Sequence, residues 1–172
     1  IPTVCKIVHV LDFLDGNIAR HGPLPHLARN QLQEAAMSTG REFDVIVYGA
    51  TGYTGRLVAE YLSKQYGVGG DLKWAMAGRS ADKLAAVRDE IGAPADTPFV
   101  VADANDPASL KAMAERAGAI ATPVGPYQLY GEDVVAACVD AGTDYVDLCG
   151  EPGWMHEMIG KYETKAQASG AR

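Results

Sequence analysis

The residues best suited to chemistry are three glycines spaced three positions apart, Gly49, Gly52 and Gly55, which directly follow the apolar run Phe43–Tyr48. A turn without side chains lets backbone N–H groups approach an anion closely, and a helix beginning near Tyr53 would point the positive end of its dipole at the same anion. A pyrophosphate suits such a turn. Because the turn ends a predicted strand and opens a predicted helix, nucleotide binding is favoured over a purely structural role.

The end of the second predicted strand indicates which dinucleotide would bind. An NAD site normally carries Asp or Glu here, because a carboxylate accepts a hydrogen bond from the ribose 2′-hydroxyl. The chain instead reads Gly78-Arg79-Ser80, whose guanidinium suits a 2′-phosphate and whose serine would start a helix with free N–H groups. NADP is therefore preferred over NAD, and NADPH over NADH. The alternative is that Arg79 is solvated and Ser80 only caps the helix.

The later predicted strands end in further candidates. Asp103 lies where the adenine edge is expected, although it equally suits the start of a turn. Gly125, Pro126 and Tyr127 form a rigid loop after the fourth strand, at the edge where ligands bind in open α/β sheets. Gly125 permits close backbone approach, and Tyr127 could stack near the nicotinamide or bind its ribose. Glu151, after the fifth strand, could act as an acid or base, but capping of the next helix is the favoured interpretation.

Other reactive side chains are expected to be structural. Cys149 has no visible partner base and is interpreted as a small buried residue, while His156 lacks a companion ligand and is expected to face solvent. No metal site is predicted. No tyrosine is followed four residues later by a lysine, so the Tyr-x-x-x-Lys pair of short-chain dehydrogenases is absent, and so are the phosphate-loop, zinc-protease and esterase motifs.

The elements that would position these residues alternate regularly. Five apolar runs of strand length are separated by amphipathic stretches of helical length, which predicts an α/β fold with a doubly wound, Rossmann-like parallel sheet covered on both faces. The predicted strands are 43–48, 72–77, 99–102, 119–122 and 145–148. The predicted helices are 53–66, 81–91, 107 to about 118, 132–141 and 154–168. Because the fourth strand lacks bulk, it is not expected at a central position.

Composition bounds the rest. The 172 residues suit one domain with an appendage, and 15 Lys and Arg against 22 Asp and Glu give a net charge of −7. This acidic balance, with no cluster of cations, argues against nucleic acid as a partner. Three widely spaced cysteines without a C-x-x-C pair indicate reduced thiols, and no apolar run reaches the length of a membrane span. We therefore expect a soluble, cytoplasmic protein.

Residues 1–36 differ from the remainder, since they hold three of the four histidines but none of the eight tyrosines. We interpret them as an N-terminal extension of unknown origin, which is either upstream sequence or a genuine extension packed on the domain edge. The nucleotide-binding domain is expected over residues 41–172.

Four segments in order resemble the NADP-binding domain of saccharopine dehydrogenase-like oxidoreductases, in the branch that includes trans-acting enoyl reductases. They are VIVYGATGYTGRLV (45–58), AGRS (77–80), VGPYQLYG (124–131) and DYVDLCGE (144–151). The resemblance spans 41–172 and implies a hydride-transfer enzyme that uses NADPH. It places the three glycines at the pyrophosphate, Arg79 at the adenosine phosphate and residues 125–127 beside the nicotinamide. In this family a substrate domain follows and the chain returns to complete the sheet, so this chain is expected to be the cofactor half, inactive alone.

We therefore predict an NADP-dependent oxidoreductase, represented by its dinucleotide-binding domain, that transfers hydride to an unknown, enoyl or lipid-like substrate and could form oligomers. The alternative is a non-catalytic NAD(P)-binding redox sensor or regulator similar to NmrA-like proteins, and a third possibility is that the incomplete sheet binds no nucleotide. No catalytic residue is assigned. The residues predicted to bind the cofactor are Gly49, Thr51, Gly52, Tyr53, Thr54, Gly55, Arg79, Ser80, Asp103, Gly125, Pro126 and Tyr127.

Overall fold

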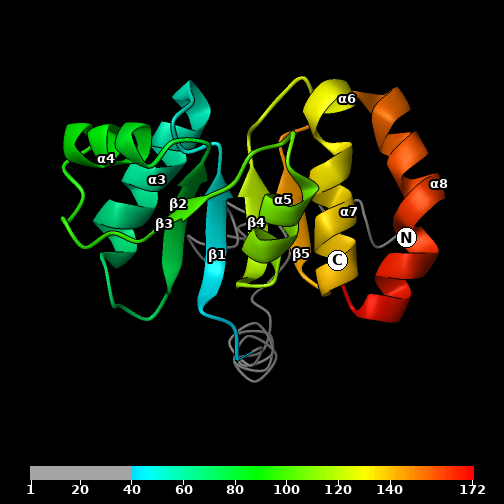
Figure 1. Cartoon of the computed structure of the whole chain (residues 1–172), viewed down its shortest axis with the longest axis horizontal. Helices are drawn as coiled ribbons and strands as arrows, with labels where there is room; N and C mark the ends of the chain where they lie inside the picture. The colour runs from blue at the N-terminus through cyan, green and yellow to red at the C-terminus, as the bar shows by residue number, and fades with distance from the viewer. Residues whose placement is uncertain (1–39) are drawn as a thin grey trace, which may run out of the picture.

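A computed structural model describes residues 40–172, and the extension predicted for residues 1–36 lies outside this part of the chain. Five strands form one parallel sheet in the order β3-β2-β1-β4-β5, as Figure 1 shows. This arrangement confirms the predicted doubly wound α/β fold. The strands are β1 (Phe43–Tyr48), β2 (Trp74–Gly78), β3 (Phe99–Val101), β4 (Ala117–Thr122) and β5 (Asp144–Asp147).

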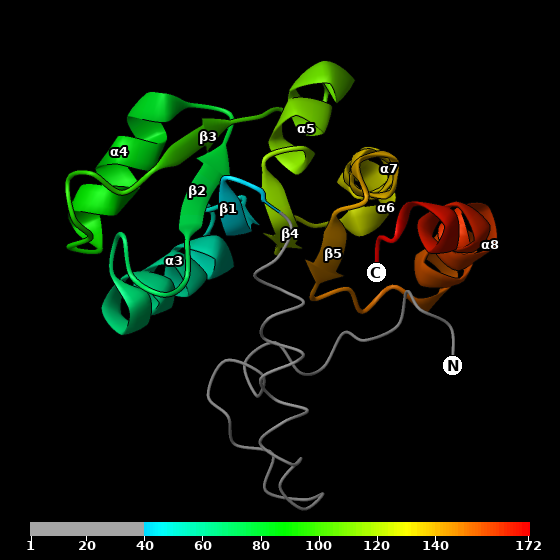
Figure 2. The ribbon, with the colours of Figure 1, turned by 90° about the horizontal axis from the view of Figure 1, so that it is seen from below.

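Helices cover both faces of the sheet, as the end-on view in Figure 2 shows. The helices are α3 (Tyr53–Tyr66), α4 (Ala81–Glu90), α5 (Pro107–Ala114), α6 (Tyr127–Tyr130), α7 (Glu132–Ala141) and α8 (Pro152–Ser169). On one face, α3 and α4 pack on β1 and β2 through a core that includes Val47 and Met76. On the other face, α5 and α7 pack on a core that includes Ile46 and Ile120. Successive strand residues thus serve opposite faces, as the pleat requires.

The helix boundaries follow local chemistry that the sequence predicts. Ser80 accepts the Lys83 N–H at 3.3 Å and caps α4. Asp106 accepts the Ala108 N–H at 3.1 Å and caps α5, whose first residue is Pro107. These caps satisfy N–H groups that the first turn of a helix leaves unpaired, and serine, aspartate and a first-position proline are residue types that favour such a start.

The position predicted for the fourth strand was wrong. β4 begins two residues earlier than expected and lies between β1 and β5, although its residues are small. The volume of the core comes from other elements, and Ile120 is the one bulky β4 side chain, fully buried. A small residue also serves a purpose here, since a Cβ at Gly118 would lie 3.0 Å from the Asp44 carbonyl oxygen of β1. α5 correspondingly ends at Ala114, before the expected residue 118.

Arg41 joins the ends of two helices at the bottom of the sheet. Its guanidinium donates to the Ala114 carbonyl of α5 at 2.9 Å, to the Ala141 carbonyl of α7 at 2.5 Å and to the Thr143 hydroxyl at 3.0 Å. Thr143 is fully buried and donates its hydroxyl to the Ala114 carbonyl at 2.7 Å. A cation at the carboxyl ends of helices stabilises their dipoles and satisfies carbonyls that have no helical partner.

We predict that Arg41→Ala lowers the free energy of unfolding by about 2 kcal/mol, because three hydrogen bonds to a charged group are lost and two carbonyls lose a partner. Urea denaturation measures the change. Arg116→Ala is the matched control, since the exposed Arg116 pairs with Glu42 at 2.7 Å and lies over the Phe43 ring. An exposed pair of this kind contributes about 1 kcal/mol or less. Equal losses in the two variants would contradict the prediction.

Candidate dinucleotide-binding site

The turn after β1 is built so tightly that two of its positions, Gly49 and Gly55, require glycine. Gly49 has a φ of +91°, and a Cβ there would lie 2.3 Å from Cγ2 of Val124. Gly52 donates its N–H to the Gly49 carbonyl at 3.0 Å. A Cβ at Gly55 would lie only 2.1 Å from the same carbonyl oxygen, so α3 can approach the turn this closely only without a side chain. The main chain is therefore exposed at the carboxyl edge of the sheet.

The first turn of α3 is left open to an anion. Gly52 precedes the helix and supplies no side-chain cap, and the first turn holds no acidic residue. The helices that follow β2 and β3 are capped by Ser80 and Asp106, so the uncapped end of α3 differs from its neighbours. The free N–H groups and the dipole of α3 suit a pyrophosphate, so the residues of this turn are compatible with a dinucleotide. The remaining predicted residues of this turn lie around it, with Thr54 exposed and Tyr53 81% exposed.

An open hollow of about 370 Å³ adjoins this turn at the ends of β2 and β3. It brings together predicted residues from three strand ends and one residue that the sequence analysis missed, Lys83. The residues lining it are Thr51, Arg79, Ser80, Lys83 and Asp103. Arg79 and Lys83 are exposed, and neither forms an ion pair with another residue in 40–172. Two such cations beside two hydroxyl groups suit a phosphate.

Lys83 could have been found from its position in the helix. It lies three residues after the Ser80 cap, in the first turn of α4, where a cation opposes the helix dipole. A cation in that place does not stabilise the helix, which makes Lys83 a candidate ligand for an anion.

Asp103 starts a turn, which is one of the two interpretations considered for it, and its contact with adenine stays a prediction. It lines the hollow, and its Oδ1 atom accepts the Asn105 main-chain N–H at 3.0 Å, as the start of a turn does. Tyr48, at the end of β1, lies close by and was not singled out by the sequence. Burial raises the pKa of the Tyr48 hydroxyl and the Asp103 carboxylate adds to this rise, whereas the Arg79 guanidinium and the Ala104 N–H lower it. Tyr48 is therefore a core residue whose hydroxyl lies near the charged groups of the hollow.

On the opposite side of the turn lies the loop after β4. Val124 reaches the main chain of Gly49, so this loop and the turn after β1 are in contact. Gly125 and Pro126 are exposed at the same edge of the sheet and are joined by a cis peptide bond. The structure thus places the predicted nicotinamide segment beside the predicted pyrophosphate turn.

Tyr127 has a different setting from the one expected. It is only 6% exposed, and its ring lies 5.6 Å from that of Trp154. Its hydroxyl donates to the Thr122 carbonyl and accepts the Leu148 N–H, each at 3.1 Å. The hydroxyl expected to bind the nicotinamide ribose is therefore engaged by main chain, and the side chain joins the loops after β4 and β5. A contact of its ring with the nicotinamide stays a prediction.

Glu151 caps a helix, but not the one expected. Its carboxylate accepts the Tyr127 N–H at 2.8 Å and the Gln128 N–H at 3.1 Å, so it caps the short helix α6. The following helix α8 begins at Pro152 without a side-chain cap. The sequence could not show this, because the carboxylate and its donors lie more than 20 residues apart.

Cys149 and His156 lie as predicted. Cys149 is buried, its Sγ atom accepts the Glu151 N–H at 3.3 Å, and burial raises the pKa of its thiol. This setting disfavours the thiolate that a nucleophile needs. His156 is exposed on α8, and residues 40–172 contain no group of His, Cys, Asp and Glu side chains arranged to hold a metal ion.

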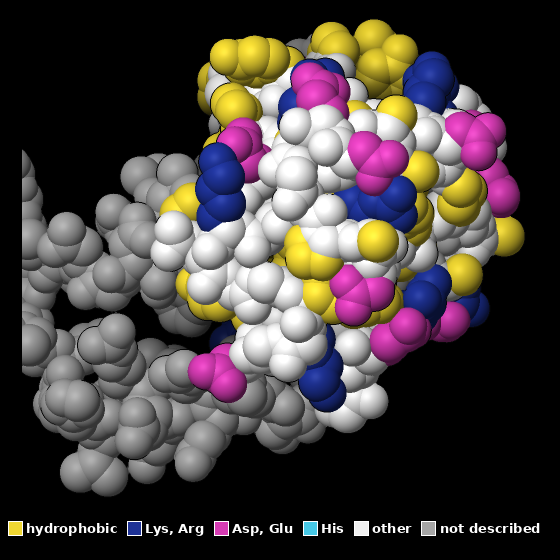
Figure 3. All heavy atoms as spheres, turned by 90° about the vertical axis from the view of Figure 1, so that its left-hand side faces the viewer, with side chains coloured by type: hydrophobic (Ala, Val, Ile, Leu, Met, Phe, Trp, Pro, Cys, Tyr) yellow, Lys and Arg dark blue, Asp and Glu magenta, His cyan; other side chains and the backbone are white. Residues whose placement is uncertain are grey.

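Acidic and basic side chains are interspersed on the face of the molecule around α4, and no extended surface of one sign is seen there (Figure 3). A ligand that needs a broad basic surface finds none on this face.

Among residues 40–172, no helix combines the length and the apolar character required to cross a bilayer.

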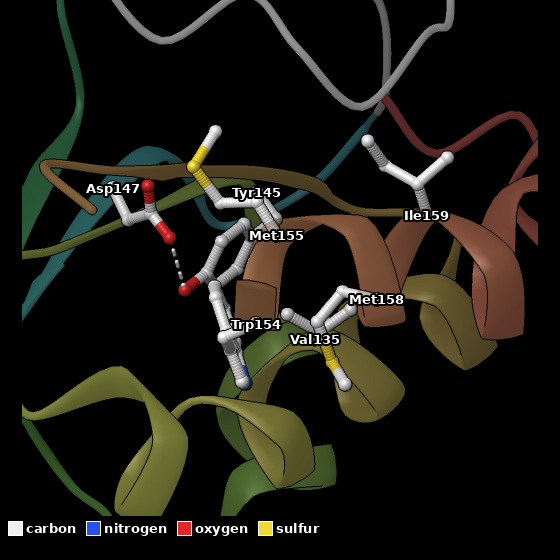
Figure 4. Close-up of a pocket in the computed structure, with 7 residues that line it drawn as sticks. All are labelled: Val135, Tyr145, Asp147, Trp154, Met155, Met158 and Ile159. Atoms are coloured by element: carbon white, nitrogen blue, oxygen red, sulfur yellow. Dashed lines mark hydrogen bonds between the residues drawn. The ribbon is translucent and has the colours of Figure 1, made fainter. Parts of the chain in front are cut away.

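A buried carboxylate ends β5. Figure 4 shows Tyr145 and Asp147 at a cavity of about 20 Å³ between β5, α7 and α8. Asp147 is 2% exposed, accepts the Tyr145 hydroxyl at 2.8 Å and accepts the Cys149 N–H at 3.1 Å. Burial raises the pKa of Asp147, and these two hydrogen bonds only partly oppose the rise. The carboxylate fixes the start of the loop that contains Glu151.

We predict that Asp147→Asn makes the protein more stable than the wild type at pH 8. Because the pKa of Asp147 is raised in the folded protein, folding favours the protonated form, and stability is lost as pH rises through the folded pKa. Asparagine still accepts the Cys149 N–H through its one carbonyl oxygen, and its NH2 group can donate to the Tyr145 hydroxyl oxygen in place of the bond that Asp147 accepts. Because the variant carries no charge here, the difference in unfolding free energy should grow from pH 4 to pH 8. Urea denaturation across this range measures it, with the exposed Asp71→Asn as control. A destabilised Asp147→Asn variant at pH 8 would refute this.

Comparisons with known proteins agree with this geometry. The trans-acting enoyl reductase of Mycobacterium ulcerans is 48% identical over 136 residues, and a Mycobacterium tuberculosis protein provisionally named as a trans-acting enoyl reductase is 51% identical over 136 residues. Both alignments cover 78% of this chain and 32% of the relative, so the chain spans about a third of the length of these curated relatives.

Solved structures show the same fold. Apo saccharopine dehydrogenase (L-Glu forming) from Saccharomyces cerevisiae has a TM-score of 0.57 at 16% identity, covering 74% of this chain and 25% of that chain. Citrobacter triphenylmethane reductase, solved with NADP(H), has a TM-score of 0.51 at 22% identity, covering 73% of this chain and 45% of that chain. The model of the saccharopine dehydrogenase NADP-binding domain matches residues 45–172. The chain therefore belongs to the saccharopine dehydrogenase NADP-binding domain family, with NADP as its cofactor.

Proposed function

We propose that this chain is the cofactor-binding part of an oxidoreductase that reduces an enoyl or lipid-like substrate. The observation that carries the proposal is the combination of a glycine turn at the open end of α3 with a hollow lined by two cations that have no ion-pair partner within residues 40–172. The enoyl class is taken from the names of the mycobacterial relatives, and the lipid-like class from the family resemblance of the sequence. The domain is proposed to span 41–172, and its cytoplasmic location is proposed because the described cysteines, Cys138 and Cys149, are free thiols.

The proposed binding mode places NADPH along the carboxyl edge of the sheet. The pyrophosphate would lie on the N–H groups at the start of α3, between Gly49 and Gly55. The 2′-phosphate would lie in the hollow between Arg79 and Lys83, where charge-assisted hydrogen bonds favour it. The absence of a carboxylate at the end of β2 removes the group that normally binds an unphosphorylated ribose.

The nicotinamide half would then lie towards Gly125 and Pro126. When bound, NADPH supplies the hydride for reduction. The described residues bind and orient the cofactor, and no proton donor is assigned among them. A small-molecule or lipid-like substrate is proposed, and assembly into oligomers is compatible with this arrangement.

The activity is tested with the protein expressed from its complete gene, incubated with NADPH and a panel of enoyl thioesters of different chain lengths. Loss of absorbance at about 340 nm, with one NADPH consumed per double bond reduced, is the expected result. NADPH binding without oxidation across the whole panel would instead support the non-catalytic sensor.

We predict that Arg79→Ala and Lys83→Ala each weaken NADPH binding about 10- to 100-fold while leaving NADH binding nearly unchanged. Each variant removes a charged partner of the 2′-phosphate, which corresponds to about 1.5–3 kcal/mol. Titration calorimetry with both dinucleotides measures the ratio of affinities. The exposed Lys111→Ala on α5 is the control. If NADH and NADPH affinities fell equally, neither residue would bind the 2′-phosphate.

We predict that Gly55→Ala abolishes measurable NADPH binding and lowers stability, because the new Cβ would lie 2.1 Å from the Gly49 carbonyl oxygen. Relief of this clash requires movement of main chain in the turn that holds the pyrophosphate. Gly160→Ala is the control, since a Cβ there meets no atom within 4 Å and α8 gains a better helix former. Calorimetric titration and thermal unfolding measure both effects. Unchanged NADPH binding by Gly55→Ala would contradict the proposed site.

A further inference from the structure

The first turn of α6 depends on an acceptor from a distant part of the chain. Pro126 precedes this helix and has no side-chain acceptor, so it cannot cap the helix itself. The Tyr127 and Gln128 N–H groups donate instead to the two carboxylate oxygens of Glu151, at 2.8 and 3.1 Å. One side chain in the loop after β5 therefore holds the main chain that directly follows Gly125 and Pro126.

Three strand ends are linked through this contact. The loop after β4 is bound to the loop after β5 by the Glu151 carboxylate and by the Tyr127 hydroxyl, which accepts the Leu148 N–H at 3.1 Å. The same loop touches the pyrophosphate turn, since Val124 fills the space beside Gly49 that a Cβ would need. The position of residues 124–126 is therefore set between a fixed turn on one side and Glu151 on the other.

We propose that Glu151 is a positioning residue, which holds residues 124–126 in the geometry that receives the nicotinamide half of NADPH. The inference rests on the proposed function, because it needs NADPH at this edge of the sheet. Both carboxylate oxygens accept main-chain N–H groups, so Glu151 acts through the loop and not as a catalytic acid or base. Hydrogen bonds to a charged acceptor are among the strong ones, which suits a residue that must fix a loop.

The test compares Glu151→Ala and Glu151→Gln with Glu157→Ala, a control on the nearby helix α8 whose carboxylate binds the exposed Lys161. The probes are NADPH and adenosine 2′,5′-bisphosphate, which carries only the adenosine half. For Glu151→Ala we expect NADPH affinity to fall about 10-fold, since two charged hydrogen bonds are lost. Affinity for adenosine 2′,5′-bisphosphate should stay within about twofold, because the hollow at Arg79 is built from other strand ends. Glu151→Gln keeps one acceptor oxygen, so its NADPH affinity should lie between those of Glu151→Ala and the wild type.

A second measurement needs no ligand. Hydrogen exchange of the Tyr127 and Gln128 amides should be faster in Glu151→Ala than in the wild type and unchanged in Glu157→Ala, because only the former loses the acceptor of these N–H groups. We also expect nicotinamide fluorescence to change when NADPH binds the wild type, and to change less when it binds Glu151→Ala. These readouts report the loop and the ring, whereas a purely structural role would affect both probes alike.

Any one of three results would overturn the inference. The first is wild-type affinity of Glu151→Ala for NADPH, and the second is an equal loss of affinity for both probes. The third is exchange of the Tyr127 and Gln128 amides of Glu151→Ala at the wild-type rate. Wild-type protein that binds neither probe would overturn the proposed function itself, which distinguishes the two failures.

Discussion

The closeness of α3 to the turn after β1 is the constraint on which the site depends. The Gly49 carbonyl lies where a side chain at residue 55 would have to be, so helix and turn meet main chain against main chain. This contact brings the first N–H groups of α3 to the surface of the sheet edge without a side chain in front of them. An anion can reach them, and no carboxylate of the first turn competes with it. The edge is suited to an anion because α3 and the turn pack there through main chain.

The two halves of this edge are built by different means. At the end proposed for adenosine, the candidate binding groups are two exposed cations, Arg79 just before α4 and Lys83 in its first turn, beside a hollow. At the other end, polar side chains bind main chain: the buried Tyr127 and the half-buried Glu151 join the loops after β4 and β5. One end can thus attract a phosphate by charge, while the other presents a shaped backbone surface. A dinucleotide has this same asymmetry between a phosphorylated ribose and an uncharged ring.

Local features of the structure were predictable from sequence, and contacts between distant residues were not. β1 and α3 have the predicted bounds, and the Ser80 and Asp106 caps lie where the residue types place them, because these choices depend on neighbours within a turn. The family resemblance was confirmed by the match over residues 45–172. The central place of β4 was missed because strand order is decided by pairing between remote segments, not by the bulk of one strand. Glu151 was assigned to the wrong helix for the same reason, and Lys83 was passed over because its cation matters only beside Arg79.

The contact of Arg41 with the ends of α5 and α7 has a practical consequence for protein engineering. Secondary structure alone would suggest starting a recombinant version at Phe43, the first residue of β1. Such a truncation would discard the guanidinium that neutralises two helix termini around the buried Thr143 hydroxyl, more than 70 residues further along the chain. Expression vectors for crystallography or ligand screening should therefore retain Arg41 with some residues before it. Otherwise the loss of these hydrogen bonds would be mistaken for an intrinsically low stability of the domain.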